Sequence, residues 1–523
     1  MTARTWAARA WLWAPLLALA WKGVWLAHDA FPFHADEAVV ALMARHILQG
    51  ARPVFFYGQA YMGSLDAYLI AAGFWLLGER VLTVRVVQAL LYALTVALSV
   101  RLLTRWTRDP AAGAALGLLM AVPTVNMLLY TTITLGGYNE ALLLGTLGLA
   151  VATASWATTG RGATVLGVLG GLGLWANPLA GVYLLPAAGY ALAQTPPTRR
   201  GRWLAGLLLG GLLGAAPWWW YGLQHGWGAL VQDLGGYAEP GPWYARWLRH
   251  GLYWLVLGLP VTLGLRPPWD VTLLAWPLAA PTLVAYGLLA RFALAARGLA
   301  GRFPRWVAAL FIAAFVLTGF GADPSGRYFL PLTHMLLLWL AAGWARGRRR
   351  QPRIANAALA LLLLYFAAGT WQTATRPPRL TALFAPEMTG LTPDRPLQAF
   401  LERHNLRTGY TTYWIAYPLA FLSGEELRFS PRLPYHLDLR YTPRDDRIPA
   451  YTRAACRAAS PAYVVAVKQT ALLQRLRAGF RTHGLAWREA HVGAFVVLYD
   501  LSRPISPWEL GLSPPPPEAW CEP

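Results

Sequence analysis

The sequence predicts an α-helical polytopic membrane protein with a small α/β domain at its C-terminal end. Hydrophobic residues make up 56% of the 523 residues and charged residues only 13%, which is about half the charged fraction of a typical soluble protein. Apolar runs of about 20 residues, long enough to cross a bilayer, recur through residues 1–375. From residue 376 the composition changes to Arg-, Pro- and Asp-rich sequence.

The excess of positive charge does not indicate a nucleic-acid partner. The chain has 45 Lys and Arg against 24 Asp and Glu, a formal net charge of +21. These cations cluster in the linkers between apolar segments, where the positive-inside bias of membrane proteins accounts for them. We therefore expect the partner of this chain to be a lipid bilayer and not a nucleic acid.

The apolar runs predict about eleven transmembrane helices. Arginine clusters lie in alternate linkers, and the positive-inside bias places that side in the cytoplasm. The sequence thus predicts a multi-pass protein of the inner (plasma) membrane with a cytoplasmic N-terminus, and with loops 28–80 and 222–269 and region 376–523 outside the cytoplasm. The expected spans are 7–27, 81–101, 112–130, 140–158, 163–176, 179–193, 203–221, 270–291, 306–322, 328–345 and 354–372, and 250–265 is either a short interfacial helix or a further span.

Region 376–523 predicts the α/β domain. Two β-like runs, Tyr463–Val467 and Phe495–Tyr499, stand on either side of a helical run, Ala471–Phe480. Cys456 and Cys521 are the only cysteines of the chain. Outside the cytoplasm they could pair, and the sequence leaves a disulfide and two free thiols equally open.

An acidic pair follows the first apolar segment, in His34-Ala35-Asp36-Glu37, and opens a helical stretch at 36–49. Carboxylates at a bilayer surface are costly and commonly mark chemistry or an ion path. Asp36 has two interpretations, a reactive carboxylate or a helix N-cap, because Asp is a favoured cap residue. On a helix Glu37 would point about 100° away from Asp36, so the two are not expected to act as one dyad.

Two more charged residues stand at the expected outer ends of spans. Glu140 begins the span at 140–158, where a carboxylate in the first turn would also stabilise the helix. Arg327 precedes the span at 328–345. Its guanidinium suits bidentate phosphate contact, but a snorkelling interfacial Arg would show the same pattern. Both interpretations stay open for each residue.

The organisation of the chain resembles the GT-C superfamily of glycosyltransferases. The features are the long first loop with Asp36-Glu37, the helix after it, and the segment Phe55-Phe56-Tyr57-Gly58-Gln59-Ala60-Tyr61-Met62-Gly63-Ser64-Leu65-Asp66. Within the superfamily the chain is similar to protein O-mannosyltransferases and lipid A aminoarabinose transferases of glycosyltransferase family 39. The similarity covers residues 1–375 in organisation and is strongest over 25–180.

The resemblance implies transfer of a sugar from a polyprenyl-phosphate-linked donor to a protein, lipid or glycan acceptor at the outer face, with inversion. It implies Asp36 as base or acceptor-orienting carboxylate, with Glu37 beside it. Some members need a metal, so a divalent cation (Mg²⁺ or Mn²⁺) held by Asp36 and Glu140 stays open, and no other cofactor is expected. Donor and phosphate binding would fall to Arg327, Tyr328, Gln59 and Tyr61, and a second acidic site to Glu140 and Asp66.

One departure from the family pattern concerns charge. The aminoarabinose-type enzymes carry a Lys in the first-loop segment, where this chain has Gly63-Ser64. The missing cation must come from Arg327, a metal or the second loop, or else the donor differs. A polysaccharide polymerase or ligase is an alternative, although it would concentrate Arg and His in one outer loop more strongly than 222–250 does. A lipid-linked glycan flippase or transporter is another, although it would carry charges within spans that are nearly uncharged here.

Overall fold

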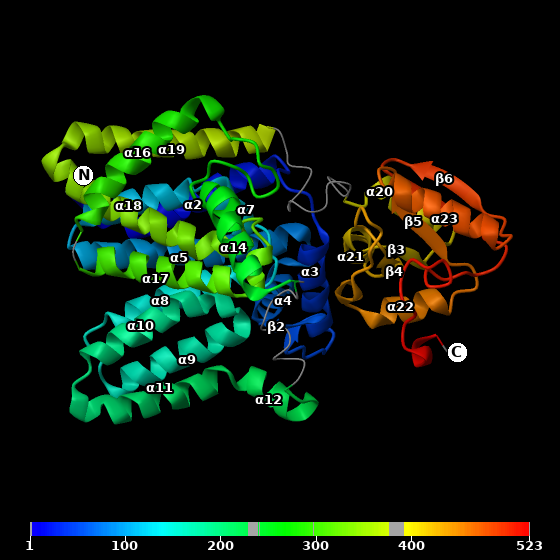
Figure 1. The fold of residues 1–523 in the computed structure, drawn as a ribbon, viewed down its shortest axis with the longest axis horizontal. Helices are drawn as coiled ribbons and strands as arrows, with labels where there is room; N and C mark the ends of the chain where they lie inside the picture. Colours follow the sequence, from blue (N-terminus) through cyan, green and yellow to red (C-terminus); the bar gives the residue numbers. More distant parts are fainter. Residues whose placement is uncertain (1–2, 228–238, 240, 297, 376–391, 522–523) are drawn as a thin grey trace. The chain divides into compact units, whose positions relative to one another are not determined.

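The structure, a computed structural model, describes residues 3–227, 239, 241–296, 298–375 and 392–521 (Figure 1). The chain divides into two compact units. The helical unit comprises Met1–Ala30, Ala60–Leu69 and Leu76–Pro377, and the α/β unit comprises Phe31–Gln59, Ile70–Trp75 and Pro378–Pro523. Residues 31–59 of the first loop therefore fold with the C-terminal region, although apolar helices flank them in the sequence.

Helices occupy every predicted span of the helical unit. Among the residues that the structure describes, six helices are long and apolar enough to cross a membrane: α2 (Ala10–Ala27), α5 (Val81–Thr107), α16 (Trp276–Leu294), α17 (Leu299–Leu317), α18 (Leu330–Arg350) and α19 (Pro352–Thr375). The total number of membrane crossings stays a prediction. The remaining predicted spans fall on α6 (Pro110–Ala121), α7 (Val125–Tyr130), α8 (Tyr138–Ala152), α9 (Gly160–Ala176), α10 (Gly181–Gln194), α11 (Arg200–Gly214) and α12 (Ala216–His225), and α1 (Ala3–Ala8) precedes them all.

Two of the predicted spans, 112–130 and 203–221, are each divided between two helices. Pro123 follows the end of α6, and a proline restricts the residue before it to extended conformations. Thr124 then caps α7, because its hydroxyl oxygen accepts a hydrogen bond from the backbone N–H of Met127 at 3.3 Å. Pro217 similarly stands in the first turn of α12. Residues 250–265 are divided among α14 (Trp243–Tyr253), a π-helical turn (Trp254–Gly258) and α15 (Leu259–Thr262).

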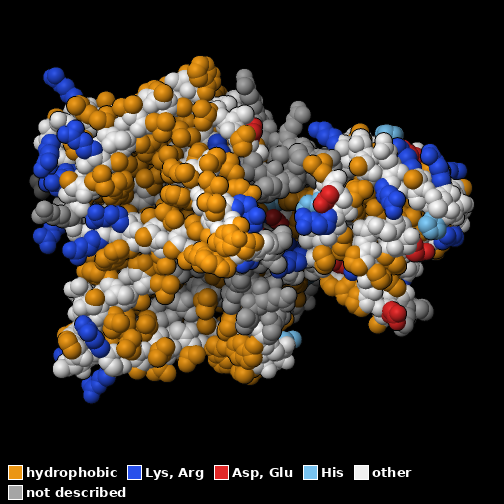
Figure 2. All heavy atoms as spheres, in the orientation of Figure 1, with side chains coloured by type: hydrophobic (Ala, Val, Ile, Leu, Met, Phe, Trp, Pro, Cys, Tyr) orange, Lys and Arg blue, Asp and Glu red, His pale blue; other side chains and the backbone are white. Residues whose placement is uncertain are grey.

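Glycines bring α9 and α11 into close contact. A Cβ atom at Gly167 would lie 2.1 Å from the carbonyl oxygen of Leu207, and one at Gly171 would lie 2.2 Å from that of Gly211. The backbones approach this closely because α9 has no side chain at these two positions, as in other membrane helix pairs with small residues four apart. Elsewhere α5 packs against α2 and α6, and α18 packs against α16 and α17 (Figure 1). Figure 2 shows hydrophobic side chains over the outer faces of these helices.

The α/β unit contains a five-stranded mixed sheet in the order β4-β3-β5-β7-β6. β3 pairs in parallel with β4 and β5, whereas β7 pairs antiparallel with β5 and β6. The predicted strands coincide with β5 and β7, and the predicted helical run lies within α23. The bounds are β3 (Thr408–Thr412), β4 (Arg428–Leu433), β5 (Ala462–Ala466), β6 (Arg488–Val492), β7 (Phe495–Tyr499), α20 (Arg395–Arg403), α21 (Tyr413–Leu422), α22 (Pro449–Cys456) and α23 (Thr470–Thr482).

Alternation along the central strands builds a core on each face of the sheet. Val464 and Val497 face one way, toward α20 and α21. Val465 and Val496 face the other way, toward α23. Cys456, at the end of α22, forms a disulfide with Cys521, which settles the alternative that the sequence left open. The first loop contains α3 (Ala35–Leu48), β1 (Phe55–Phe56), β2 (Gln59–Gly63) and α4 (Leu65–Leu77). Of these elements, α3 and β1 lie wholly within the α/β unit.

Candidate functional site

Asp36 lies in the first turn of α3 but does not cap that helix. The cap is His34, whose ring nitrogen Nδ1 accepts a hydrogen bond from the backbone N–H of Glu37 at 3.3 Å. The interpretation of Asp36 as an N-cap is therefore wrong. Its carboxylate is half-buried and accepts a hydrogen bond from the hydroxyl of Tyr413, the first residue of α21. A residue of the C-terminal part of the same unit, Tyr413, thus holds one oxygen of the Asp36 carboxylate.

Arg447 brings a positive charge to this part of the α/β unit. Its side chain is buried, with an exposed fraction of 8%, and its guanidinium donates to the backbone carbonyl of Tyr57 at 3.1 Å. With the amide of Gln59 oriented so that its oxygen faces the guanidinium, that oxygen accepts at 2.9 Å. The guanidinium also lies 5.5 Å from the ring centre of Phe56 and 5.6 Å from that of Tyr413.

Backbone geometry at Gly58 allows this approach. Its φ is +72°, a left-handed conformation that favours glycine, and a Cβ atom there would lie 2.8 Å from Cδ of Arg447. The Tyr57-Gly58-Gln59 motif therefore binds the side chain of an arginine from the C-terminal region. Gln59, predicted to bind the donor, contacts Arg447 in this structure.

Several ionisable groups interact with the buried guanidinium of Arg447. Burial would lower the pKa of Arg447, but Tyr413, Asp36 and Asp445 raise it overall, so it stays charged. Burial also raises the pKa of Asp445 to about 7, with Arg447 opposing the shift and Asp36 and Asp446 adding to it. One carboxyl group beside Arg447 therefore titrates near neutral pH.

Glu37 differs sharply from Asp36, because its side chain is fully buried. Within this acidic pair, only Asp36 has a part-exposed side chain. The two carboxylates therefore have separate environments, as their positions on a helix predict.

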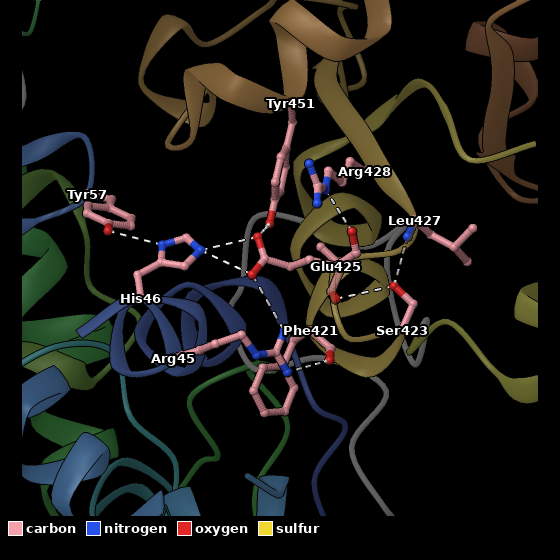
Figure 3. Close-up of polar contacts among 10 residues, drawn as sticks. Arg45, His46, Tyr57, Phe421, Ser423, Glu425, Leu427, Arg428 and Tyr451 are labelled. Carbon is pink, nitrogen blue, oxygen red and sulfur yellow. Dashed lines mark hydrogen bonds and ion pairs between the residues drawn. The ribbon is translucent and has the colours of Figure 1, made fainter. Parts of the chain in front are cut away.

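The other end of α3 is clamped by Glu425, which follows α21 (Figure 3). Nε2 of His46 lies 3.1 and 3.2 Å from the two carboxylate oxygens of Glu425, and the hydroxyl of Tyr451 donates to Glu425 at 2.7 Å. Arg45 lies 3.7 Å from the same carboxylate and donates to the carbonyl of Phe421 at 3.2 Å. Burial would raise the pKa of Glu425, but these hydrogen bonds and charges lower it below its usual value. Since α3 packs along α21, polar contacts fix both ends of the helix that carries Asp36.

In the helical unit, the two residues of the predicted second acidic site lie near one another. Asp66 and Glu140 are both buried and interact electrostatically, but neither carboxylate oxygen of Glu140 has a hydrogen-bond partner among the residues that the structure describes. Gln88 donates to Asp66 at 2.6 Å, and Thr134 donates to its other oxygen. Asn139 in turn donates to Gln88 at 2.7 Å. Asp66 is therefore part of an internal hydrogen-bond network that reaches Asn139 in the first turn of α8.

Tyr61 and Tyr328, two predicted donor-binding residues, line one cavity of about 200 Å³ in the helical unit. The ring centres of Tyr61 and Phe320 are 5.6 Å apart, and those of Phe320 and Tyr328 are 5.4 Å apart. The remaining wall comes from Tyr138, from the turn before α10 and from the last turns of α17. The cavity is mostly apolar, with the tyrosines, Asn177 and Thr318 as its polar groups, and therefore suits a ligand with a hydrocarbon part.

Arg327 precedes Tyr328, which is part of the cavity wall. The guanidinium of Arg327 lies over the ring of Tyr328, 4.9 Å from the ring centre. It also forms an ion pair with Asp323 at 2.7 Å, and its side chain is 20% exposed. Arg266 holds the same turn by donating to the carbonyl of Pro324 at 2.7 Å. Arg327 is thus fixed by a carboxylate, which the sequence analysis did not foresee.

The structure explains the departure at Gly63-Ser64. A Cβ atom at Gly63 would lie 2.4 Å from the carbonyl oxygen of Trp175, so no side chain fits there. Ser64 is buried, with an exposed fraction of 1%. The cation that contacts the first-loop segment is Arg447, which the sequence analysis missed together with Tyr413 and Asp445.

The predicted cation ligands Asp36 and Glu140 belong to different units. Among the residues that the structure describes, no group of three or more His, Cys, Asp or Glu side chains is placed to hold a metal ion. Neither carboxylate of the predicted pair therefore stands in such a group, and the divalent cation stays a prediction.

Comparisons with known proteins agree with this fold. Residues 64–221 match the family model described as dolichyl-phosphate-mannose-protein mannosyltransferase. The crystal structure of ArnT from Cupriavidus metallidurans bound to undecaprenyl phosphate is similar, with a TM-score of 0.59 and 13% identity over 98% of this chain and 100% of that chain.

Two other solved structures have lower TM-scores. The oligosaccharyltransferase of Archaeoglobus fulgidus has a TM-score of 0.47 and 12% identity over 88% of this chain and 68% of its own. The arabinofuranosyltransferase AftD from Mycobacteria has a TM-score of 0.47 and 17% identity over 95% of this chain and 42% of its own. No curated protein sequence matches the chain. The chain has the fold of the GT-C glycosyltransferases, with a mannosyltransferase family match over residues 64–221, and the resemblance predicted from its sequence is confirmed.

Proposed function

We propose that the chain transfers a sugar from a polyprenyl-phosphate-linked donor to an acceptor at the extracytoplasmic membrane face, with inversion at the anomeric carbon. The observation that carries this proposal is the half-buried carboxylate of Asp36, held through one oxygen by Tyr413. A carboxylate with one oxygen fixed and the other available is suited to accept a proton from a positioned hydroxyl group. The family match and the fold support the reaction class.

The proposed chemistry needs one proton transfer and one substitution. Asp36 takes the proton from the acceptor group as that atom forms a bond to the anomeric carbon. The bond from the anomeric carbon to the phosphate oxygen breaks on the opposite side, so the configuration inverts and the polyprenyl phosphate departs as an anion. Tyr413 keeps Asp36 in one orientation during this step, and Arg447 supplies a balancing positive charge in the α/β unit.

Donor binding is assigned to the aromatic cavity and to Arg327. The cavity walls are apolar and suit the first isoprene units of a polyprenyl chain, while Arg327 suits the phosphate. Arg327 already pairs with Asp323, so the phosphate must share the guanidinium with that carboxylate. The ArnT structure with undecaprenyl phosphate supports a lipid phosphate as the kind of ligand that this fold accepts.

The proposed location of the α/β unit outside the cytoplasm agrees with its disulfide. Cys456 and Cys521 are joined, and structural disulfides persist in oxidising compartments. The positive-inside bias of the linkers points in the same direction. We infer that the acceptor reaches Asp36 from the extracytoplasmic side.

The test is to identify the lipid that co-purifies with the protein and to follow its consumption. Lipid extracts of the purified protein, analysed by mass spectrometry, should contain a polyprenyl phosphate that carries a sugar. Incubation of that lipid with protein in cell-envelope extract should release the unglycosylated polyprenyl phosphate. A flippase would leave the sugar on the lipid, and a polysaccharide polymerase or ligase would act on a lipid-linked chain of several sugars. Either result would overturn the proposal.

A further inference from the structure

A second cavity of the helical unit, of about 330 Å³, lies where four helices begin or end. Trp106 and Thr107 line it from the end of α5, and Asp109 lines it from the start of α6. Ala300 comes from the start of α17, and the last turns of α18 supply the arginines described below. Figure 2 shows Lys and Arg side chains gathered at one end of this unit. By the positive-inside bias, these helix ends face the cytoplasm.

The cavity has an excess of positive charge. The carboxylate of Asp109 receives hydrogen bonds from Arg348 and Arg349, each at 3.0 Å, so its own charge is already compensated. Arg346 and Arg350 also line the cavity, and among the residues that the structure describes neither is paired with a carboxylate. Nε of Arg346 is buried without a hydrogen-bond partner within the same described part. A buried N–H group without an acceptor costs free energy, and a ligand that accepts a hydrogen bond from this group would remove that cost.

The walls next to these arginines are apolar and lead into the expected bilayer. Trp106 stacks on Phe303, with ring centres 5.2 Å apart and an angle of 17° between the planes. Trp306, one turn further along α17, is 41% exposed, and Leu294, at the end of α16, is 63% exposed. A ligand with an anionic head and hydrocarbon tails would satisfy both parts of this surface, whereas a small soluble anion would use only the arginines.

We propose that this basic cavity binds the phosphate of an anionic phospholipid headgroup, with the acyl chains lying along α16 and α17. Basic pockets between membrane helices at the cytoplasmic surface are suited to such headgroups. The site is separate from the aromatic cavity, because the 19 residues of α17, at about 1.5 Å per residue, put its two ends about 28 Å apart. The inference does not depend on the proposed transfer reaction.

The test is native mass spectrometry of the full-length protein in neutral detergent. The probes are phosphatidylglycerol, phosphatidylcholine with the same acyl chains, and inorganic phosphate. Wild-type protein should retain phosphatidylglycerol at least tenfold more tightly than phosphatidylcholine. The Arg346→Ala/Arg350→Ala variant should lose about tenfold or more of that affinity, because it loses charge-assisted contacts to the phosphate. It leaves both ion pairs of Asp109 in place.

The control variant is Arg199→Ala/Arg202→Ala, which removes two exposed charges from another arginine cluster on the same predicted face. It should bind phosphatidylglycerol as the wild type does. Ala342→Leu, which fills the cavity without changing its charge, should weaken binding even if the double arginine variant unfolds. Equal retention of the two phospholipids, or equal loss in the control variant, would overturn the proposal. Displacement of the lipid by millimolar inorganic phosphate would show that the site takes a soluble anion instead.

Discussion

Arg447 is the residue that organises the candidate site of the α/β unit. A buried guanidinium needs compensating charge, and Asp36 interacts with it electrostatically, as do Tyr413 and Asp445. The sequence predicted Asp36 from its place after an apolar segment. It could not predict Tyr413, which stands 377 residues further along the chain, because no local pattern links an isolated tyrosine or arginine to a distant carboxylate.

The unusual pKa of Asp445 gives a prediction about stability. The folded protein holds a proton on this carboxyl up to about pH 7, whereas an unfolded chain releases it near pH 4. The stabilising contribution is therefore present in full below about pH 4 and is lost as the pH rises through 7, at up to about 1.4 kcal/mol per pH unit. Hydrogen exchange of peptides from residues 440–455, corrected for intrinsic rates, should show easier opening at pH 8 than at pH 5.

Asp445→Asn is the matching variant, because it keeps the shape of the side chain and does not titrate. Its opening free energy over the same peptides should change little between pH 5 and pH 8. The same pH slope in wild type and variant would assign the effect to another group.

Arg327 provides a second prediction at this scale. Arg327→Ala should weaken binding of undecaprenyl phosphate about 10- to 100-fold, since one charge-assisted hydrogen bond contributes about 1.5–3 kcal/mol. Arg327→Lys should restore only part of the affinity, because an ammonium lacks the planar fork. Binding can be measured by thermal stabilisation of the purified protein.

The ion pair with Asp323 supplies the control for this experiment. Asp323→Asn breaks the pair but keeps the cation, so lipid binding should be retained or strengthened. An equal loss of affinity in Asp323→Asn and Arg327→Ala would make the pair a structural feature of the turn before α18.

At the scale of helices and strands, hydrophobic pattern was a reliable guide. The predicted strands fall on β5 and β7 because alternating residues face two separate cores. Helix interruptions were missed, although Pro123 and Pro217 were local signals for them. The close pairing of α9 and α11 was also missed, since it depends on glycines of both helices meeting in space.

The disulfide gives the prediction for this scale. Cys456 ties the end of α22 to the C-terminal segment, across a sequence separation of 65 residues. Cys456→Ser should lower the free energy of opening of α22 and β4 by about 2–4 kcal/mol, as loss of a long-loop disulfide typically does. Hydrogen exchange of the full-length protein measures this quantity. Cys456→Ser/Cys521→Ser should match the single variant, and unchanged protection in both would contradict the prediction.

At the scale of the whole molecule, sequence order is a poor guide to which segments fold together. Residues 31–59 belong to the same compact unit as the C-terminal region, although about 320 residues separate the two. Span prediction depends only on local composition and cannot show this. The consequence is that Asp36, found from the N-terminal part of the sequence, takes its partners from the C-terminal part.

The membrane orientation is the prediction at this scale. In a background with Cys456 and Cys521 replaced by Ser, single cysteines at the exposed positions Ser502 and Arg199 would report opposite faces. A membrane-impermeant maleimide should label the cysteine at 502 in spheroplasts and the cysteine at 199 only after permeabilisation. The reverse pattern would invert the predicted topology and place Asp36 away from an extracytoplasmic acceptor.

The central claim is that Asp36 activates the acceptor, and Asp36→Asn tests it most directly. The amide keeps the shape of the side chain and removes its capacity to accept the acceptor's proton. Sugar release from the co-purified lipid donor should fall at least tenfold, with binding of undecaprenyl phosphate unchanged, whereas Asp438→Asn, at a carboxylate with an exposed side-chain fraction of 67%, should leave the rate as in the wild type. A well-folded Asp36→Asn protein that keeps more than about a tenth of the wild-type rate, a loss below about 1.4 kcal/mol, would contradict the account.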